Sequence, residues 1–92
     1  MKIKGILKSR EVLIDGVYLS PKLSQKVYNH SPDGFMWGYG GSGPAQLALA
    51  ILLEKTNRET ALKNHQQFKR DIIAMLPQTN FEIEVDLTPY IS

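Results

Sequence analysis

Alternation of apolar and polar side chains predicts a strand near each end of the chain. Ile3 and Leu7 share one face of residues 2–8, and apolar residues alternate with glutamates over residues 81–85. This spacing is typical of a strand with one solvated face. The solvated faces carry opposite charges, from Lys2, Lys4 and Lys8 at one end and from Glu82, Glu84 and Asp86 at the other. If the two strands are neighbours, cross-strand ion pairs of about 0.2 to 1 kcal/mol each offset this charge asymmetry.

Residues 11–19 are predicted to form a β-hairpin. Apolar triplets flank the pair Asp15-Gly16, which favours a type I′ turn because both of its central residues take a positive φ. Residues 22–29 fit a short helix or an irregular loop equally well. Residues 35–37 are apolar after a turn signal and fit a short strand.

Two helices are predicted in the second half of the chain. Ser42 or Gly43 caps the first, which has Pro44 in its first turn and runs to about residue 56. Residues 47–53 are apolar all round, which indicates burial on several sides, by the sheet, the other helix or a partner subunit. The second helix is expected over about residues 58–76. Its inward stripe consists of Ala61, His65, Phe68, Ile72 and Met75.

These elements predict an α+β fold, with a small, mostly antiparallel sheet of three or four strands packed against two helices. A mixed sheet, in which the last strand pairs elsewhere, is the alternative. A chain of 92 residues with 42% hydrophobic and 22% charged residues suits one globular domain over residues 1–92.

Composition excludes several classes of function. The absence of cysteine removes disulfides, thiolate nucleophiles and zinc ribbons. The chain start lacks an apolar export segment, and the uncharged residues 34–53 are broken by glycines and a proline, so we expect a cytoplasmic protein and no membrane span. A net charge of +2 with no basic cluster predicts no nucleic-acid partner.

The glycine-rich segment 37–44 is the most distinctive part of the sequence. Gly38, Gly40 and Gly43 match the spacing of a dinucleotide-binding loop, but a second helix follows instead of the required strand. A phosphate-binding P-loop needs Lys and Ser or Thr where this chain has Pro44-Ala45. Both nucleotide motifs are therefore rejected, and we expect no cofactor.

Two interpretations of this segment stay open. Backbone N–H groups at a helix start attract anions, so the segment could hold an anionic small molecule or nucleotide. Alternatively, the glycines only let the chain turn and pack closely. The candidate ligand-binding residues are His30, Trp37, Tyr39, Gly41, Ser42, Gly43 and Gln46. A lone Trp such as Trp37 is more often a core residue.

The sequence gives little support for an enzyme. His65 lies within an apolar helical stripe and is interpreted as a core histidine, whereas His30 lies in a polar turn with Ser31 and Asp33. Three polar neighbours in a turn do not make a catalytic triad, because triad geometry is spatial. No cluster offers three metal ligands, so no metal site is predicted.

The motif Asn29-His30-Ser31-Pro32, followed by residues 34–35 and 37–48, resembles a family of small prokaryotic domains of unknown function that also occurs in phages and mobile elements. The hairpin at Asp15-Gly16 and the element Phe68-Lys69-Arg70 are similar too. The resemblance implies a bacterial, archaeal or viral cytoplasmic protein and no particular activity.

Three hypotheses on function follow. The first is a non-enzymatic binding module for an anionic small molecule or nucleotide near Ser42 and Gln46. The second is a protein interaction or assembly module, including a homo-oligomer, suggested by the all-apolar helix. The third and weakest is a hydrolase that uses His30.

Overall fold

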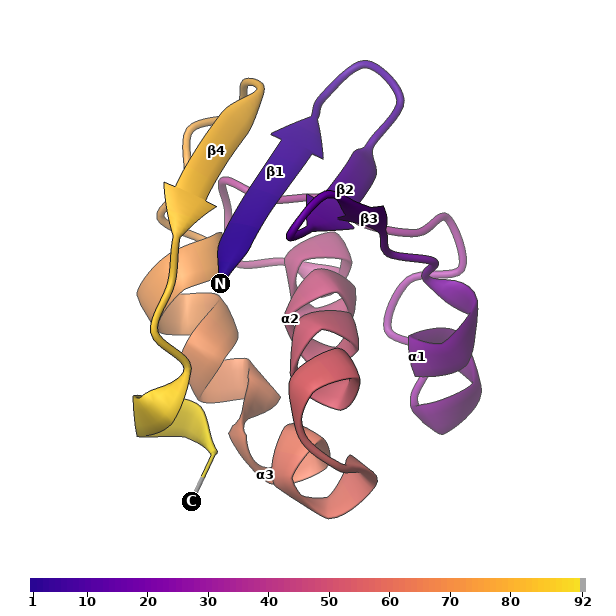
Figure 1. The fold of residues 1–92 in the computed structure, drawn as a ribbon. Coiled ribbons are helices and arrows are strands. Elements are labelled where there is room, and N and C mark those ends of the chain that lie inside the picture. Colours follow the sequence, from indigo (N-terminus) through magenta and orange to yellow (C-terminus); the bar gives the residue numbers. More distant parts are fainter. Residues whose placement is uncertain (92) are drawn as a thin grey trace.

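The computed structural model describes residues 1–91, in which a four-stranded sheet lies over three helices (Figure 1). The strands are β1 (Lys2–Ile6), β2 (Glu11–Ile14), β3 (Val17–Tyr18) and β4 (Phe81–Glu84). Every pair is antiparallel, and the order across the sheet is β3-β2-β1-β4. The predicted α+β fold is confirmed.

The hairpin turn has the predicted geometry. Asp15 and Gly16 both have a positive φ, of 49° and 83°, as a type I′ turn requires. Asp15 also ties the turn to β1, because its N–H donates to the Lys2 carbonyl and its carboxylate accepts from the Lys2 N–H, both at 2.9 Å. The turn therefore fixes the register of the sheet as well as the hairpin.

Strands β1 and β4 are neighbours, which meets the condition for the expected cross-strand ion pairs. Lys2 lies opposite Glu84 and Lys4 lies opposite Glu82. Among residues 1–91 these lysines form no ion pair within 4.0 Å, and Glu84 instead contacts the ammonium of Met1 at 3.4 Å. The lysines and glutamates are thus cross-strand neighbours, but their charged groups do not form ion pairs.

The helices are α1 (Lys22–Val27), α2 (Ser42–Lys55) and α3 (Arg58–Phe68). Helix α2 runs through the centre of the molecule and contacts α1 and α3, which explains why its apolar residues cover every side (Figure 1). Asn57 caps α3 by accepting the N–H of Thr60 at 2.9 Å. The helix alternative for residues 22–29 is the one observed.

Helix α3 ends earlier than predicted. The chain continues as a π-helical turn, η1 (Lys69–Ile73), in which the Ala74 N–H donates to the Lys69 carbonyl at 2.8 Å. A π turn contains an extra residue, so later side chains are rotated relative to the α-helical stripe. Met75 is consequently 76% exposed, and its predicted inward position was wrong.

Two segments outside the main helices and strands also bury side chains in the core, namely residues 35–37 and the turn η2. Residues 35–37 form no strand, and their apolar character reflects the burial of Phe35 and Trp37 in an irregular segment. The 3-10 turn η2 (Thr88–Tyr90) packs Tyr90 against Phe68 at the end of α3, and the Tyr90 hydroxyl donates to Asp71 in η1 at 2.8 Å. Over residues 1–91, no helix has the length and apolar character needed to cross a bilayer.

Candidate functional site

The glycine-rich segment is anchored at its start. Trp37 is fully buried, packs edge-to-face on Phe81 with ring centroids 4.9 Å apart, and donates its indole N–H to the Thr79 carbonyl at 2.9 Å. The Gly38 N–H donates to the Ile73 carbonyl at 3.0 Å. The aromatic anchor therefore belongs to the core and fixes this segment to η1 and to the loop before β4.

Gly38 must be glycine in this structure. Its φ is +87°, and an added Cβ would lie 2.9 Å from the Leu76 carbonyl oxygen. A side chain there would be strained both by its backbone conformation and by contact with backbone that cannot move aside. Close packing thus accounts for this glycine without a ligand.

The middle of the segment faces solvent. Tyr39 is 43% exposed, and its ring covers Gly41, which leaves no space for a Cβ on that residue. Gly40 is different, because it is exposed, has an ordinary φ and would bring an added Cβ within 4 Å of no other group. Neither packing nor backbone conformation explains the glycine at position 40.

Helix α2 begins immediately afterwards without a side-chain cap. The N–H groups of Ser42 and Gly43 have no acceptor within residues 1–91, and Pro44 has no N–H. Gly43 is buried because its Cα lies against Met36, which would be 2.7 Å from an added Cβ. The helix start therefore keeps two free donors beside an uncrowded loop.

The Gln46 side chain is buried and forms hydrogen bonds within the protein, so it does not face solvent as a ligand contact would. Its Oε1 accepts the N–H groups of His30 at 2.7 Å and Ser31 at 2.9 Å. Its Nε2 donates to the Ser24 hydroxyl at 2.9 Å and to the Tyr28 carbonyl at 3.1 Å. With all four hydrogen bonds made and no exposed surface, the side chain holds the loop after α1 against α2.

The side chains of the two histidines, His30 and His65, are in contact although they lie 35 residues apart in the sequence. Their Nε2 atoms are 2.9 Å apart. Nδ1 of His65 lies 3.0 Å from the Ala61 carbonyl, which can only accept, so this nitrogen carries the proton. In the neutral pair, His30 then donates from Nε2 to the Nε2 lone pair of His65.

The surroundings of His30 disfavour its charged form. Burial lowers the pKa of His30, and the nearby charges of His65 and Lys69 lower it further. The Tyr28 ring stacks on the imidazole with centroids 4.3 Å apart. His65 is buried, with 5% exposure, and is also a core histidine as predicted.

The structure brings some of the predicted site residues together and separates others. Gln46 and His30 are joined directly, and Tyr39 contacts Gly41. Trp37, Gly43 and Gln46 are buried, whereas Tyr39 and Ser42 reach the surface. The contact of His65 with His30 was not predictable from the sequence, because no spacing motif relates residues so far apart.

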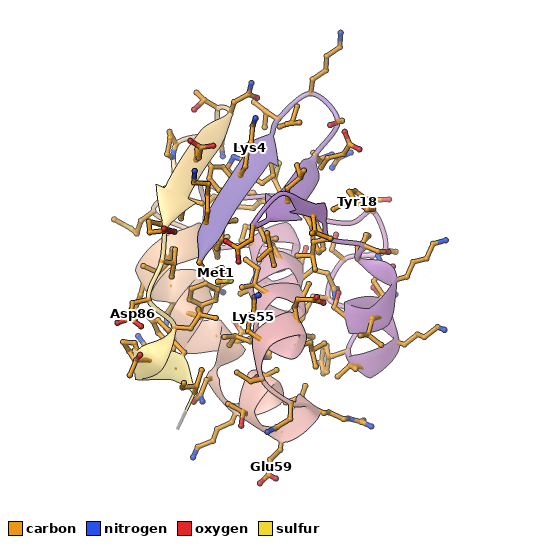
Figure 2. The ribbon with its side chains drawn as sticks, viewed as in Figure 1. Met1, Lys4, Tyr18, Lys55, Glu59 and Asp86 are labelled. Atoms are coloured by element: carbon orange, nitrogen blue, oxygen red, sulfur yellow. The ribbon has the colours of Figure 1, made fainter. Side chains whose placement is uncertain are left out.

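A second region stands out at the free edge of β3. Three exposed apolar side chains gather there, with Val17 68%, Tyr18 56% and Leu23 60% exposed. Tyr18 lies between two hollows of about 150 and 230 Å³ that run along β3 towards α1 and the end of α2. Figure 2 places Tyr18 on the α1 side of the sheet, away from Met1 and Asp86.

The backbone of Tyr18 is unpaired on its outer side. Leu19 donates to the Val12 carbonyl at 2.8 Å, so Tyr18 lies opposite Leu13 at a position without hydrogen bonds between the two strands. Its N–H and C=O therefore point away from the sheet and have no partner in residues 1–91. The β4 edge differs, since it carries exposed Glu82 and Glu84, whose charges disfavour the pairing of another strand.

A larger hollow, of about 540 Å³, lies elsewhere. It is open to solvent between Met1, Lys55 and the segment after β4, with an ion pair between Lys55 and Asp15 at 3.7 Å on its wall. None of the seven predicted site residues lines it. Residues 1–91 also contain no group of three or more histidine and acidic side chains arranged to hold a metal ion.

Comparison with known proteins gives a family but no activity. No curated protein and no solved structure matches the sequence. The model of a family of unknown function, DUF6166, matches residues 4–88 and so covers both the glycine-rich segment and the histidine pair. The chain belongs to the DUF6166 family of unknown function.

Proposed function

We propose that this protein is an interaction module whose β3 edge takes up an extended apolar segment of another polypeptide. The observation that carries the proposal is the unpaired backbone of Tyr18 between two hollows, bordered by exposed Val17 and Leu23. An added strand gains main-chain hydrogen bonds at such an edge, and hollows on alternate positions select its side chains.

The composition of the edge indicates the chemistry of the partner. Residues 17–19 carry no charge, and apolar side chains from α2, Ala50 and Leu53, line the larger hollow. Natural proteins usually guard a free edge with charged residues, as β4 does here. An uncharged segment with apolar side chains at alternate positions therefore fits β3 best.

Peptide titration tests this function. A blocked heptapeptide that alternates valine with threonine is added to the ¹⁵N-labelled protein, and amide shifts are followed. We expect shifts at residues 17–19 that disappear in Tyr18→Pro, because proline removes the outward N–H and the Tyr18 ring but no hydrogen bond of the sheet. Glu82→Pro removes an outward N–H from the other edge and should bind the peptide normally.

The opposite results would reject the proposal. Peptide shifts that persist in Tyr18→Pro, or that appear at β4, would place binding elsewhere. Light scattering on the same samples identifies a second copy of the chain as the partner if the protein self-associates and Tyr18→Pro is monomeric. A monomeric protein without peptide shifts would exclude the β3 edge as an interaction site.

The glycine-rich loop supports a second candidate function, the binding of an anionic small molecule. The specific observation is the pair of free N–H groups at Ser42 and Gly43 beside Gly40, whose missing side chain nothing in the fold requires. Helix starts of this kind bind phosphate groups through backbone N–H groups and the helix dipole.

Inorganic phosphate and a nucleotide are the probes for this site. We expect amide shifts at Ser42 and Gly43 that are lost in Gly40→Asp, because the new carboxylate repels the anion. Gly40→Ala is the matched control and should keep both stability and binding. Absence of shifts at the highest phosphate and nucleotide concentrations would remove this candidate.

A further inference from the structure

We propose that the hollow between the start of β1, the end of α2 and the segment after β4 binds the zwitterion of an apolar α-amino acid. The hollow measures about 540 Å³ and is lined by both charged and apolar side chains. Pockets for small molecules typically enclose about 300 to 1,000 Å³ and combine an apolar surface with a few polar groups. Neither Tyr18 nor the glycine-rich segment 37–44 lines this hollow, so the inference is independent of the functions proposed above.

A positive group with unused donors faces the hollow from the end of α2. The Lys55 ammonium has one partner within residues 1–91, the Asp15 carboxylate at 3.7 Å. An ammonium group has three N–H donors, so Lys55 can still donate to a carboxylate in the hollow. Figure 2 shows Lys55 on the same side of the molecule as Met1 and Asp86, which line the hollow with it.

The carboxylates opposite also keep unused oxygen atoms. Asp86 accepts the N–H and the hydroxyl of Thr88 through the same oxygen, Oδ1, which leaves its Oδ2 without a partner in residues 1–91. These hydrogen bonds lower the pKa of Asp86, so the carboxylate is charged at neutral pH. Glu84 contacts the Met1 ammonium through Oε2 at 3.4 Å, and its Oε1 has no partner in the same range. An ammonium group of a ligand therefore finds oxygens that the fold does not use.

The apolar surface of the hollow comes from the tail after β4. Val85 is buried, and Leu87 is partly buried against the core. Ile91 is 47% exposed, although it directly follows the buried Tyr90. An apolar side chain of the ligand would remove the surfaces of Leu87 and Ile91 from water, which is favourable.

The balance of charge favours a zwitterion over an amine or an acid. Two ammonium groups and three carboxylates line the hollow, and they belong to Met1, Lys55, Asp15, Glu84 and Asp86. The carboxylates repel an organic anion, and the ammonium groups repel an organic cation. An α-amino acid avoids both costs, because its carboxylate can contact Lys55 while its ammonium contacts Glu84 or Asp86.

Titration of the ¹⁵N-labelled protein with L-leucine tests the site. We expect amide shifts at Lys55 and at residues 84–88. Two analogues keep the apolar body of leucine but lack one charge, since isocaproate has no ammonium group and isoamylamine has no carboxylate. Both should bind about tenfold more weakly than leucine or worse, because each leaves one set of charged hydrogen bonds unmade.

Two substitutions with matched controls locate the contacts. Lys55→Gln and Glu84→Gln should each weaken leucine binding about tenfold, because each removes one charged partner of the ligand. Their controls, Lys63→Gln and Glu82→Gln, remove the same charges from exposed positions outside the hollow and should bind leucine normally.

Several outcomes would overturn the proposal. Absence of shifts around the hollow at the solubility limit of leucine would exclude the site. Equal affinity for leucine and for either analogue would show that the hollow does not recognise a zwitterion. Unchanged leucine binding in both Lys55→Gln and Glu84→Gln would place the ligand elsewhere. The analogues are compared on the unaltered protein, so that result does not depend on the folding of any variant.

Discussion

Gln46 holds residues 28–31 against helix α2 with one side chain. Replacement by leucine would remove four hydrogen bonds and leave the Ser31 N–H without a partner, while the His30 N–H and the Tyr28 carbonyl would keep only their bond to each other at 3.1 Å. Each buried group left unpaired costs about 1 to 3 kcal/mol. We expect Gln46→Leu to lower the free energy of unfolding by about 2 to 4 kcal/mol in urea titrations.

Gln66 provides the control for this substitution. It is partly exposed on α3, and no hydrogen bond of its side chain occurs within residues 1–91. Gln66→Leu should change the free energy of unfolding by less than about 0.5 kcal/mol. Equal effects of the two substitutions would show that the network around Gln46 contributes nothing to stability.

Acid is expected to weaken the fold through His30. Because the native pKa of His30 is lowered from its ordinary 6.5, the unfolded chain binds more protons between the lowered value and 6.5. The free energy of unfolding should therefore fall as the pH drops below 6.5 and level off below the native pKa. Urea midpoints measured at a series of pH values report this loss of stability.

His30→Gln should flatten that pH dependence, since glutamine does not titrate. The comparison is between wild type and variant at about pH 7.5 and about pH 5, where ordinary histidine changes charge. If both proteins lose the same stability on acidification, other groups cause the loss.

Sequence patterns identified these residues but not their roles. Gln46 and His30 were named as candidates for one anion site, and the structure joins them through a hydrogen bond inside the protein. His65 was assigned to the core from its helical stripe, which is correct, yet its contact with His30 depends on how α3 packs behind α2. Local spacing contains no information on such a contact.

At the scale of the elements, the pairing of β1 with β4 is the feature to test. Lys4 and Glu82 are direct cross-strand neighbours on the solvated face. Lys4→Glu should lower the free energy of unfolding by about 0.2 to 1 kcal/mol through like-charge repulsion. The charge-swapped pair Lys4→Glu with Glu82→Lys should recover most of the loss, and a double-mutant cycle measures this coupling.

No recovery in the swapped protein would mean that the two charges do not interact across the strands. High salt is a second control, because it screens exposed charges and should reduce the effect of Lys4→Glu.

Elements with a local cause were predictable, and those with a distant cause were not. The turn at Asp15-Gly16 needs only two residues with positive φ. The π turn η1, by contrast, lies where Gly38 donates to the Ile73 carbonyl from 35 residues away. The apolar pattern of residues 35–37 fits a strand as well as a buried irregular segment, because burial and strand pairing produce the same pattern.

For the whole molecule, one core connects all layers. Buried side chains from the sheet, from α2 and α3 and from the terminal turn form a single cluster that includes Val12, Leu49, Phe68 and Tyr90. Such a core predicts one cooperative unfolding transition. Far-UV circular dichroism and the fluorescence of buried Trp37 should give the same urea midpoint, whereas separate midpoints would contradict a single domain.

The two edges of the sheet differ, and this limits what can assemble on it. Glutamates guard β4, while the outer backbone groups of Tyr18 on β3 are free. On the other edge of the sheet, a further strand would meet the exposed glutamates of β4, whose charges disfavour a second addition. Binding at that edge would produce complexes of fixed stoichiometry rather than fibres.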